Sequence, residues 1–224
     1  MSACCCQGFE SMFGERTARR DLERYRRKGP SKPTLRLLDA LRREGVQGAT
    51  VLDIGGGVGA IQHELLASGA VRATGVDASP AYLRAATSEA ERRGHGDRVI
   101  QHEGDFVALA GDIASADVVT LDRVICCYPD VDRLVGRSAE RARRLYGLVH
   151  PRDAWWTRVA FRVLNLGLRL ARRQFRAYVH PVEAVDRISR SAGLELQLRQ
   201  DVGPIWQVVV YERTLGPPRA ARVM

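Results

Sequence analysis

The chain has 224 residues, of which 45% are hydrophobic and 27% are charged, a balance typical of one soluble globular domain that excludes a fibrous or a disordered protein. Its formal net charge is +9, and much of the excess is arginine, which favours an anionic partner such as a small acid, a nucleic acid or a lipid headgroup. Met1 to Phe13 lacks the basic start and the long apolar core of a signal peptide, so we expect a cytoplasmic protein.

A helical arm or lid is predicted for the N-terminal part of the chain, residues 1–45. Its first helix is expected at Glu15 to Lys28, where Gly29-Pro30 ends it. A second helix is expected at Ser31 to Glu44. Three leucines of this second helix form a stripe that should pack on a sheet, namely Leu35, Leu38 and Leu41.

The main domain is predicted at residues 46–215, because short apolar runs alternate there with helical segments. Helices are expected at Ala60 to Ser68 and at Pro80 to Arg93. The expected strands are Val51 to Ile54, Ala73 to Asp77, Val99 to His102, Val118 to Leu121 and Leu145 to Val149. Such alternation specifies an α/β fold with a doubly wound, mostly parallel sheet.

The alternation of strands and helices is interrupted at residues 152–180, where we predict a helical insertion. Ala154 to Arg173 is apolar at helical spacing but contains Arg158, Arg162 and Arg169. Each arginine costs about 2.5 to 3.5 kcal/mol at the bilayer centre, so we expect no integral membrane segment. An amphipathic lid or extra helix packed on the domain is favoured over a helix that binds a membrane surface.

A helix followed by two strands is predicted for the last part of the domain. The helix covers Pro181 to Ala192, and the two strands, Leu194 to Arg199 and Trp206 to Arg213, alternate around Gly203-Pro204 as an antiparallel hairpin would. Together with the five preceding strands they give a sheet of seven. Residues 216–224 are expected to be a flexible tail.

The five cysteines come as a triplet, Cys4 to Cys6, and a pair, Cys126-Cys127, rather than as the dispersed pattern of a disulfide framework. Thiolates select zinc, copper(I) and iron-sulfur clusters, so a site is conceivable if the arm folds over the pair. Adjacent cysteines are not the spacing that a tetrahedral site prefers. We therefore expect reduced thiols and no metal.

The stretch TVLDIGGGVGA, residues 50–60, crowds four glycines behind a strand that carries a carboxylate. Glycine inside an element is costly, so the cluster indicates that a ligand approaches the backbone here, at the first strand-to-helix turn. Two cofactor classes use such a turn. The spacing Gly55-x-Gly57-x-x-Ala60 fits a dinucleotide, with Asp77 as the ribose acid.

A better description is Asp53-x-Gly55-x-Gly57-x-Gly59, which resembles the nucleotide-binding motif of class I S-adenosylmethionine (SAM)-dependent methyltransferases. The resemblance extends to Asp77 after the second strand, to Gly104-Asp105-Phe106 after the third and to Ala116 to Asp122 in the fourth. It implies SAM as the cofactor, with Asp77 on the ribose hydroxyls, Asp105 on the adenine amine and Phe106 against the ring. The cofactor-binding residues that it implies are Asp53, Gly55, Gly57, Gly59, Asp77, Asp105, Phe106 and Asp122.

Within this family, most of residues 10–213 resemble the magnesium-protoporphyrin O-methyltransferase branch, because of the arginine-rich arm, the segment Asp122 to Pro129 and the long helix after the fifth strand. That branch has a catalytic histidine just before its Tyr-Pro pair. This chain has Cys127 there, and a thiol replaces an imidazole as a base at neutral pH only if its pKa is shifted.

Methyl transfer from an activated sulfonium mainly requires alignment of the acceptor and exclusion of water. A carboxylate acceptor needs no base, whereas a phenol or an amine needs one. The catalytic candidates are Tyr25, Cys127, Tyr128 and His150. Arg123 and His180 are the candidates for binding the acceptor. The sequence therefore predicts a methyltransferase that acts on a small anionic molecule, by O-methylation.

Two alternatives remain open from the sequence. A basic block in the arm is suited to phosphates and favours an RNA-modifying enzyme or a nucleic-acid binder; it comprises Arg16, Arg19, Arg20, Arg24, Arg26, Arg27 and Lys28. Against it, the fourth strand is not followed by the Asn-Pro-Pro-Tyr type of element that amino-group methylases of nucleic acids carry. The other alternative is a SAM-fold protein with a different reaction or a regulatory role.

Overall fold

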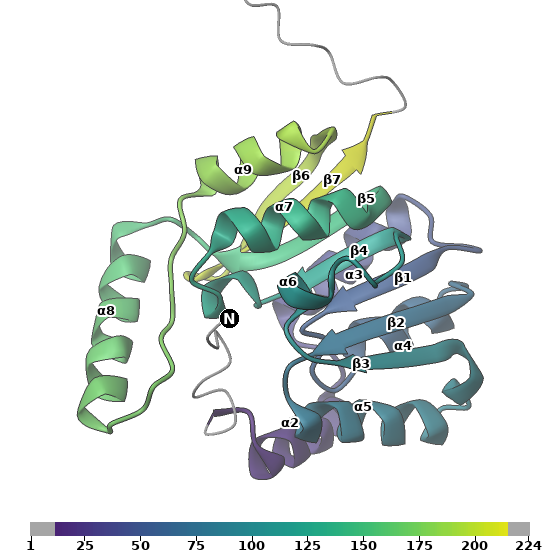
Figure 1. Cartoon of the computed structure of the whole chain (residues 1–224), viewed down its shortest axis with the longest axis horizontal. Helices are drawn as coiled ribbons and strands as arrows, with labels where there is room; N and C mark the ends of the chain where they lie inside the picture. The colour runs from purple at the N-terminus through teal and green to yellow at the C-terminus, as the bar shows by residue number, and fades with distance from the viewer. Residues whose placement is uncertain (1–11, 215–224) are drawn as a thin grey trace, which may run out of the picture.

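The computed structural model describes residues 12–214, which contain one seven-stranded sheet between two layers of helices (Figure 1). The strand order is β3-β2-β1-β4-β5-β7-β6. The first five strands are parallel, and β7 runs antiparallel to both β5 and β6. The strands are β1 (Thr50–Ile54), β2 (Arg72–Asp77), β3 (Val99–Glu103), β4 (Ala116–Asp122), β5 (Ala142–Pro151), β6 (Leu194–Val202) and β7 (Trp206–Arg213). The predicted fold is confirmed, including its terminal hairpin.

The helices divide between the two faces of the sheet. One apolar cluster joins α3 and α4 to one face, and another joins α6, α7 and α9 to the opposite face. The α-helices are α2 (Glu15–Lys28), α3 (Lys32–Arg43), α4 (Ala60–Ala67), α5 (Pro80–Arg92), α6 (Phe106–Leu109), α7 (Val131–Arg141), α8 (Trp155–Leu170) and α9 (Val182–Ser191). Burial on both faces explains why the central strands are continuous apolar runs rather than alternating ones.

Strand β7 shows this double burial most clearly. Val208 and Val210 point into the cluster that contains α3, whereas Val209 and Tyr211 point into the cluster that contains α7. All four side chains are buried. Successive side chains of a strand point to opposite faces, so the run VVVY fills both clusters at once.

The leucine stripe predicted for the second arm helix needs one correction. Leu38 and Leu41 are fully buried, but Leu35 is 38% exposed and Leu37 takes its place in the core. Leu37, Leu38 and Leu41 share one face because they follow the spacing of three and four residues, whereas Leu35 lies on the side of the helix. The stripe packs on the sheet as expected, but with Leu37 as a member.

The arm helix α2 is held to α5 by buried charge. The carboxylate of Glu89 is fully buried and receives hydrogen bonds from Arg26 of the arm at 2.8 Å and from Arg93 at 2.7 Å. Burial alone would raise the pKa of Glu89, but hydrogen bonds from Arg92, Arg93 and Arg26 hold it well below its usual range. The arm is therefore an ionically anchored part of the domain surface.

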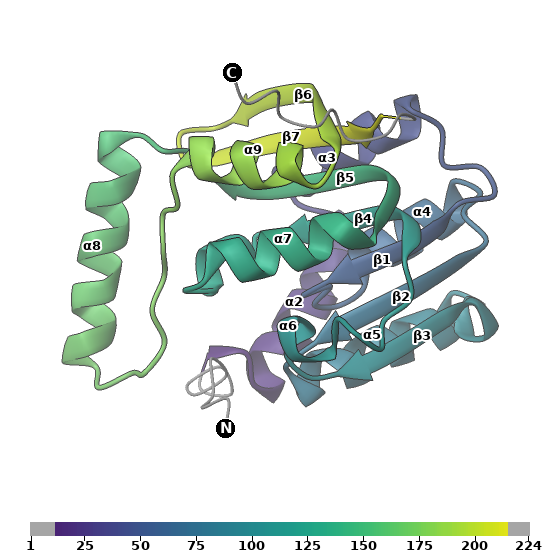
Figure 2. The ribbon, with the colours of Figure 1, turned by 45° about the horizontal axis from the view of Figure 1, so that its top comes forward.

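Helix α8 lies apart from the layers around the sheet, beside the returning chain of residues 171–180 (Figure 1; Figure 2). The helix forms where the sequence predicts it. Its buried residue is Thr157, and most of its apolar side chains face solvent. The packing on the domain that the sequence favours is thus not observed for this apolar face. The triplet Cys4 to Cys6 and the predicted tail at 216–224 lie outside the described residues.

Two histidine side chains, His63 of α4 and His95, contact each other. The Nδ1 atoms of His63 and His95 are 3.3 Å apart, and the side chain of His63 is fully buried. Burial, followed by the charge of Arg93, lowers the pKa of His63 to about 4. The folded protein therefore holds this imidazole neutral at pH values at which the unfolded chain protonates it.

We expect this histidine to make the protein acid-sensitive. The reference pKa of this histidine is 6.5, and its pKa in the folded protein is about 4. Its destabilising effect on the fold is therefore absent above pH 6.5 and grows as the pH falls to about 4. The free energy of unfolding should decrease by roughly 3 kcal/mol over this range from this group. Denaturant unfolding at several pH values measures it. His63→Gln should flatten the slope, and His102→Gln in β3 should not; equal slopes for all three proteins would contradict the assignment.

Candidate functional site

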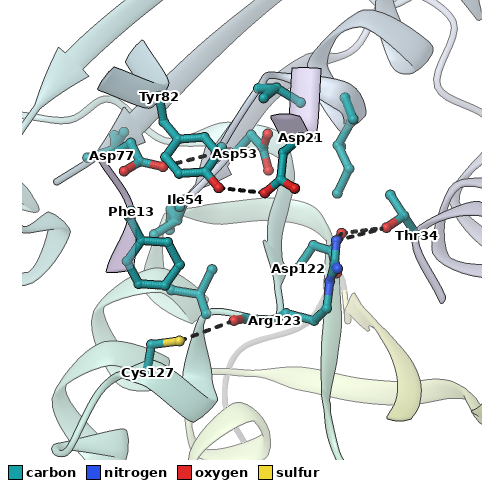
Figure 3. Close-up of a pocket in the computed structure, with 18 of the residues that line it drawn as sticks. Phe13, Asp21, Thr34, Asp53, Ile54, Asp77, Tyr82, Asp122, Arg123 and Cys127 are labelled. Carbon is teal, nitrogen blue, oxygen red and sulfur yellow. Dashed lines mark hydrogen bonds and ion pairs between the residues drawn. The ribbon is translucent and has the colours of Figure 1, made fainter. Parts of the chain in front are cut away.

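A cavity of about 260 Å³ lies at the carboxyl ends of β1, β2 and β4 (Figure 3). Its walls come from the glycine turn after β1, from the residues that follow β2, β3 and β4, and from the arm. Ligands of open α/β sheets bind in this position, outside the carboxyl ends of the strands. The arm contributes Phe13, Asp21, Arg24 and Tyr25 from one side, and Thr34 from the start of α3.

The glycine turn is built so that three of its residues have no room for a side chain or adopt a left-handed backbone. Gly55 has φ +64°, and a Cβ there would lie 2.5 Å from Val124 Cγ2. A Cβ on Gly56 would lie 2.5 Å from Asp53 Oδ2. Gly57 has φ +57°, but a Cβ would meet only the ring of Tyr82, at 3.5 Å. The turn is therefore packed from below and open toward the cavity at Gly57.

Gly59 has a different place from the one its motif implies. It stands at the N-terminus of α4 with φ +76° and is not among the residues that line the cavity. A Cβ there would lie 3.0 Å from His63 Nε2. Its visible role is to start the helix in a left-handed conformation.

Asp53 supports the turn from beneath. Its side chain is 1% exposed, and its two carboxylate oxygens accept hydrogen bonds from Thr120 Oγ1 at 2.8 Å and from Gln62 Nε2 at 3.2 Å. Burial raises the pKa of Asp53 to about 7, against the effect of these two hydrogen bonds. The carboxylate thus connects β1, β4 and α4 under Gly56.

Asp77 is held by the backbone at the end of β2. One carboxylate oxygen accepts the N–H of Gly57 at 3.0 Å, and the other accepts the N–H of Ser79 at 2.8 Å. Burial raises the pKa of Asp77, while the backbone hydrogen bonds oppose the shift. Its orientation is fixed toward the glycine turn (Figure 3).

Asp105 and Phe106 follow β3 and also line the cavity. Asp105 caps α6, because its Oδ1 accepts the N–H of Val107 at 2.9 Å. Its Oδ2 accepts the hydroxyl of Tyr128 at 3.0 Å. The structure therefore joins a predicted cofactor residue to a predicted catalytic one, a pairing that the sequence does not reveal.

The residues after β4 form a strained corner. Arg123 has φ +62°, a conformation that is unfavourable for a residue other than glycine and that clusters at functional sites. Its guanidinium donates to Asp122 Oδ1 at 2.8 Å and to Oδ2 at 3.0 Å. Thr34 of the arm also donates to Asp122, at 2.6 Å. All three residues line the cavity, so the corner ties the arm to the sheet at the site.

The cysteine pair lies next to this corner. Cys127 lines the cavity, whereas Cys126 is buried behind it, with the two sulfur atoms 3.8 Å apart. The hydrogen bond from Cys126 and the charge of Arg123 lower the pKa of Cys127, although burial opposes them. Among residues 12–214 no group of three or more metal-ligating side chains surrounds the pair.

The remaining candidates are placed less favourably for chemistry. Tyr25 lines the cavity, but burial and the neighbouring Glu64, to which its hydroxyl donates at 3.1 Å, raise its pKa. His150 is 2% exposed in β5 and does not line the cavity, and burial lowers its pKa. His180 lies outside the lining as well, with its Nε2 2.9 Å from the carbonyl oxygen of Tyr128.

Several lining residues are absent from the sequence prediction. Phe13 packs on Tyr82 with ring centroids 6.1 Å apart, and the Tyr82 hydroxyl donates to Asp21 at 2.6 Å. These contacts close the arm over the glycine turn. Some other lining residues carried a local signal, because Ile54, Gly56, Val58 and Ala60 lie within the quoted stretch 50–60. Phe13 and Asp21 of the arm meet the turn through tertiary packing alone.

Comparison with known proteins fits this arrangement. Residues 51–145 match the model of a methyltransferase domain. The chain carries a class I SAM-dependent methyltransferase domain. SAM is the cofactor of this domain, and the motif that extends from Asp53 to Gly59 lies within the matched residues. No curated protein sequence matches the chain.

Solved structures resemble this methyltransferase domain in fold. Magnesium protoporphyrin IX methyltransferase from Synechocystis with bound SAH is 18% identical, with 92% of this chain and 100% of that chain covered and a TM-score of 0.69. An O-methyltransferase family protein from Burkholderia thailandensis is 19% identical, with coverages of 96% and 65% and a TM-score of 0.72. An O-methyltransferase family 2 protein from Planctomyces limnophilus, in complex with apigenin, is 18% identical, with coverages of 88% and 62% and a TM-score of 0.64. At these identities the likeness shows the fold alone.

The methyltransferase cavity fits SAM by its own geometry. The backbone is open at Gly57, where a cofactor can approach, and two oriented carboxylates, Asp77 and Asp105, stand at the ends of neighbouring strands. Ribose hydroxyls and an adenine amine are hydrogen-bond donors that suit carboxylate acceptors.

Gly56→Ala tests whether the close packing of the turn supports cofactor binding. Its Cβ would meet Asp53 Oδ2 at 2.5 Å and Gln62 Nε2 at 2.6 Å, both on buried side chains, so the turn must shift. We expect the affinity for S-adenosylhomocysteine to fall at least about tenfold and the free energy of unfolding to fall by about 1 to 3 kcal/mol. Gly111→Ala is the control, because its Cβ would meet nothing within 4 Å. Unchanged affinity in Gly56→Ala, measured by calorimetry, would count against this account.

Proposed function

We propose that this methyltransferase transfers the methyl group of SAM to a carboxylate oxygen of a small anionic molecule. The observation that carries the proposal is the set of ionisable groups around the cavity. Among the described residues, its lining includes neither a histidine nor a lysine. Its five aspartates already accept hydrogen bonds from neighbouring groups of the protein. An acceptor that arrives already deprotonated needs no general base, so a carboxylate suits this lining best.

The tyrosines of the lining support this choice. Tyr25 donates to Glu64 and Tyr82 donates to Asp21, and burial raises the pKa of both phenols. Neither hydroxyl is suited to accept a proton at neutral pH. Cys127 has a lowered pKa, but the proposal gives it and Tyr128 the role of walls rather than of bases.

Asp77, Asp105 and Phe106 are proposed to hold the cofactor, in the roles that the family resemblance implies. SAM supplies a methyl group that is already activated on its sulfonium. The protein then has to hold the acceptor in line and keep water out. The arm suits the second task, since Phe13, Asp21 and Tyr25 contribute to the lining of the cavity.

Arg24 and Arg123 are proposed to attract the acceptor, because they are the cationic side chains among the described residues of the lining. Arg123 is fixed by Asp122, and its planar guanidinium suits a carboxylate better than a lysine would. His180 is proposed to position the wall through its contact with the Tyr128 carbonyl rather than to touch the acceptor.

The experiment below also distinguishes the two alternatives from the sequence, which are an RNA-modifying enzyme or nucleic-acid binder and a SAM-fold protein with another reaction or a regulatory role. The basic arm is partly committed within the molecule, as Arg26 pairs with Glu89 and Arg24 lines the cavity. Arg16, Arg19 and Arg27 are exposed, as a surface that binds RNA would require. The proposal keeps the small-molecule substrate and the cytoplasmic location that the sequence predicts.

A labelled-methyl assay distinguishes these functions. The protein is incubated with methyl-labelled SAM and either a small-molecule extract or total RNA. We expect label in the small-molecule fraction that mild alkali releases as volatile methanol, because methyl esters hydrolyse under conditions that leave ethers and methylamines intact.

The control for this assay is Asp77→Ala, which should transfer no label. Alkali-stable label in the small-molecule fraction would contradict a carboxylate acceptor. Label in the RNA fraction that ribonuclease removes would favour the nucleic-acid alternative. No transfer to either fraction, from a protein that binds S-adenosylhomocysteine, would favour a role other than methylation.

A further inference from the structure

Helix α8 presents a row of exposed apolar side chains, which we name the apolar stripe: Trp155, Val159, Val163, Leu166 and Leu170. Their exposed fractions are 72%, 45%, 65%, 57% and 76%. The spacings of four, four, three and four residues place them on one side of a helix with about 3.6 residues per turn. Exposed apolar patches of this kind mark interaction surfaces.

Part of the opposite side of α8 is occupied by the returning chain, although Leu164 on that side is 46% exposed. Asn165 Nδ2 donates to the Ala177 carbonyl at 2.7 Å, and Asn165 Oδ1 accepts the Ala177 N–H at 2.9 Å. Thr157 is fully buried, and Trp156 Nε1 donates to the Pro204 carbonyl at 2.9 Å. These contacts fix the rotation of the helix and leave the side chains of the apolar stripe exposed to solvent. Figure 2 shows that α8 itself lies apart from the sheet.

Positive charge borders the apolar stripe. Arg158, Arg162 and Arg169 lie along one edge of it, because each is three or four residues from a stripe member. Arg172, Arg173 and Arg176 follow in the returning chain, and residues 154–182 contain no aspartate or glutamate. Arg158 is paired with Asp153, just outside this segment.

We propose that α8 lies in the interface of an anionic lipid bilayer, with the apolar stripe toward the acyl chains and the arginines among the headgroups. An amphipathic helix with a wide apolar side and basic residues at its edge binds in this way. Tryptophan prefers the membrane interface, and Trp155 and Trp156 stand at the start of the helix. Anionic headgroups complement a segment that has six arginines and no acid.

The helix is not suited to cross the bilayer. It has 16 residues and therefore spans about 24 Å, short of the roughly 30 Å of a hydrocarbon core. No helix among residues 12–214 is long and apolar enough to span a membrane. The association is thus peripheral.

A bilayer explains the stripe better than a second copy of the chain does. Two copies that joined their stripes across a twofold axis would bring two rows of arginine together. The segment contains no carboxylate between residues 154 and 182 to pair with them. An anionic surface satisfies the stripe and the arginines at the same time.

Vesicle binding of the full-length protein tests the inference. Phosphatidylcholine vesicles are compared with vesicles that contain about 30% phosphatidylglycerol, at about 0.1 M and about 0.5 M salt. We expect at least about tenfold tighter binding to the anionic vesicles, weakened by salt, and a shift of tryptophan emission to shorter wavelength. Trp155→Phe should reduce this shift, whereas Trp206→Phe in β7 should retain it.

Paired variants separate the two components. Val163→Glu with Leu166→Glu should lower vesicle binding at least about tenfold, and Arg162→Glu with Arg169→Glu should remove the preference for anionic lipid. Val71→Glu with Ile100→Glu is the matched control, since these apolar side chains are 50% and 43% exposed elsewhere. Thermal melting and binding of S-adenosylhomocysteine should stay unchanged in all three double variants.

The inference is overturned if the wild-type protein does not bind anionic vesicles, or if the stripe variant binds as tightly as the wild type does. Equal loss of binding in the control variant would also overturn it. A wild-type dimer in light scattering that the stripe variant converts to a monomer, without vesicle binding, would assign the stripe to a second copy of the chain.

Discussion

The backbone of the glycine turn lies directly on a buried carboxylate, and the geometry of the cavity depends on this contact. Asp53 is paired in register with Thr120 of the neighbouring strand β4 and is hydrogen-bonded to it. A side chain on Gly56 would overlap the Asp53 carboxylate. The turn is thus fixed relative to two central strands, which lets Gly57 donate its N–H to Asp77 and lets α4 begin at Gly59. The proposed cofactor site is thus held by the sheet itself, and such preorganisation lowers the free-energy cost of binding.

The net charge of the molecule and the charge of its cavity have opposite signs. Five aspartates line the cavity with two arginines, whereas the excess arginine lies on the outside of the arm and along the segment that contains α8. The lining suits a cofactor with a cationic sulfonium. The basic surface acts elsewhere: Arg26 anchors the arm through Glu89, and the arginines of α8 border an exposed apolar row. The two proposals divide the anionic partner that the composition favours between an acceptor held by Arg24 and Arg123 in the cavity and a lipid surface at α8.

Local patterns predict the sheet, and tertiary contacts decide the rest. The continuous apolar runs predict where the strands lie, and the Asp-x-Gly-x-Gly-x-Gly spacing predicts the cofactor class, because both signals are local in the sequence. The order of the strands in the sheet is not predicted by them and comes from the structure. Leu35 and Leu37 show the limit, since neighbouring leucines differ in burial once the helix rotation is fixed by packing. His150 shows another limit, because a strand residue is directed into the core or into the site according to its register, which the sequence leaves open. The arm residues Phe13 and Asp21 carry no motif, and only their contacts with Tyr82 reveal them.

The central claim is that SAM binds against the open glycine turn with Asp77 as a fixed acceptor. Calorimetric titration with S-adenosylhomocysteine, comparing the wild type, Asp77→Ala and the exposed control Asp112→Ala, tests it most directly. We predict one site in the wild type and in the control, and affinity lower by at least about tenfold in Asp77→Ala, with thermal melting used to verify folding. Equal affinities in all three proteins, or no binding to the wild type, would contradict the account.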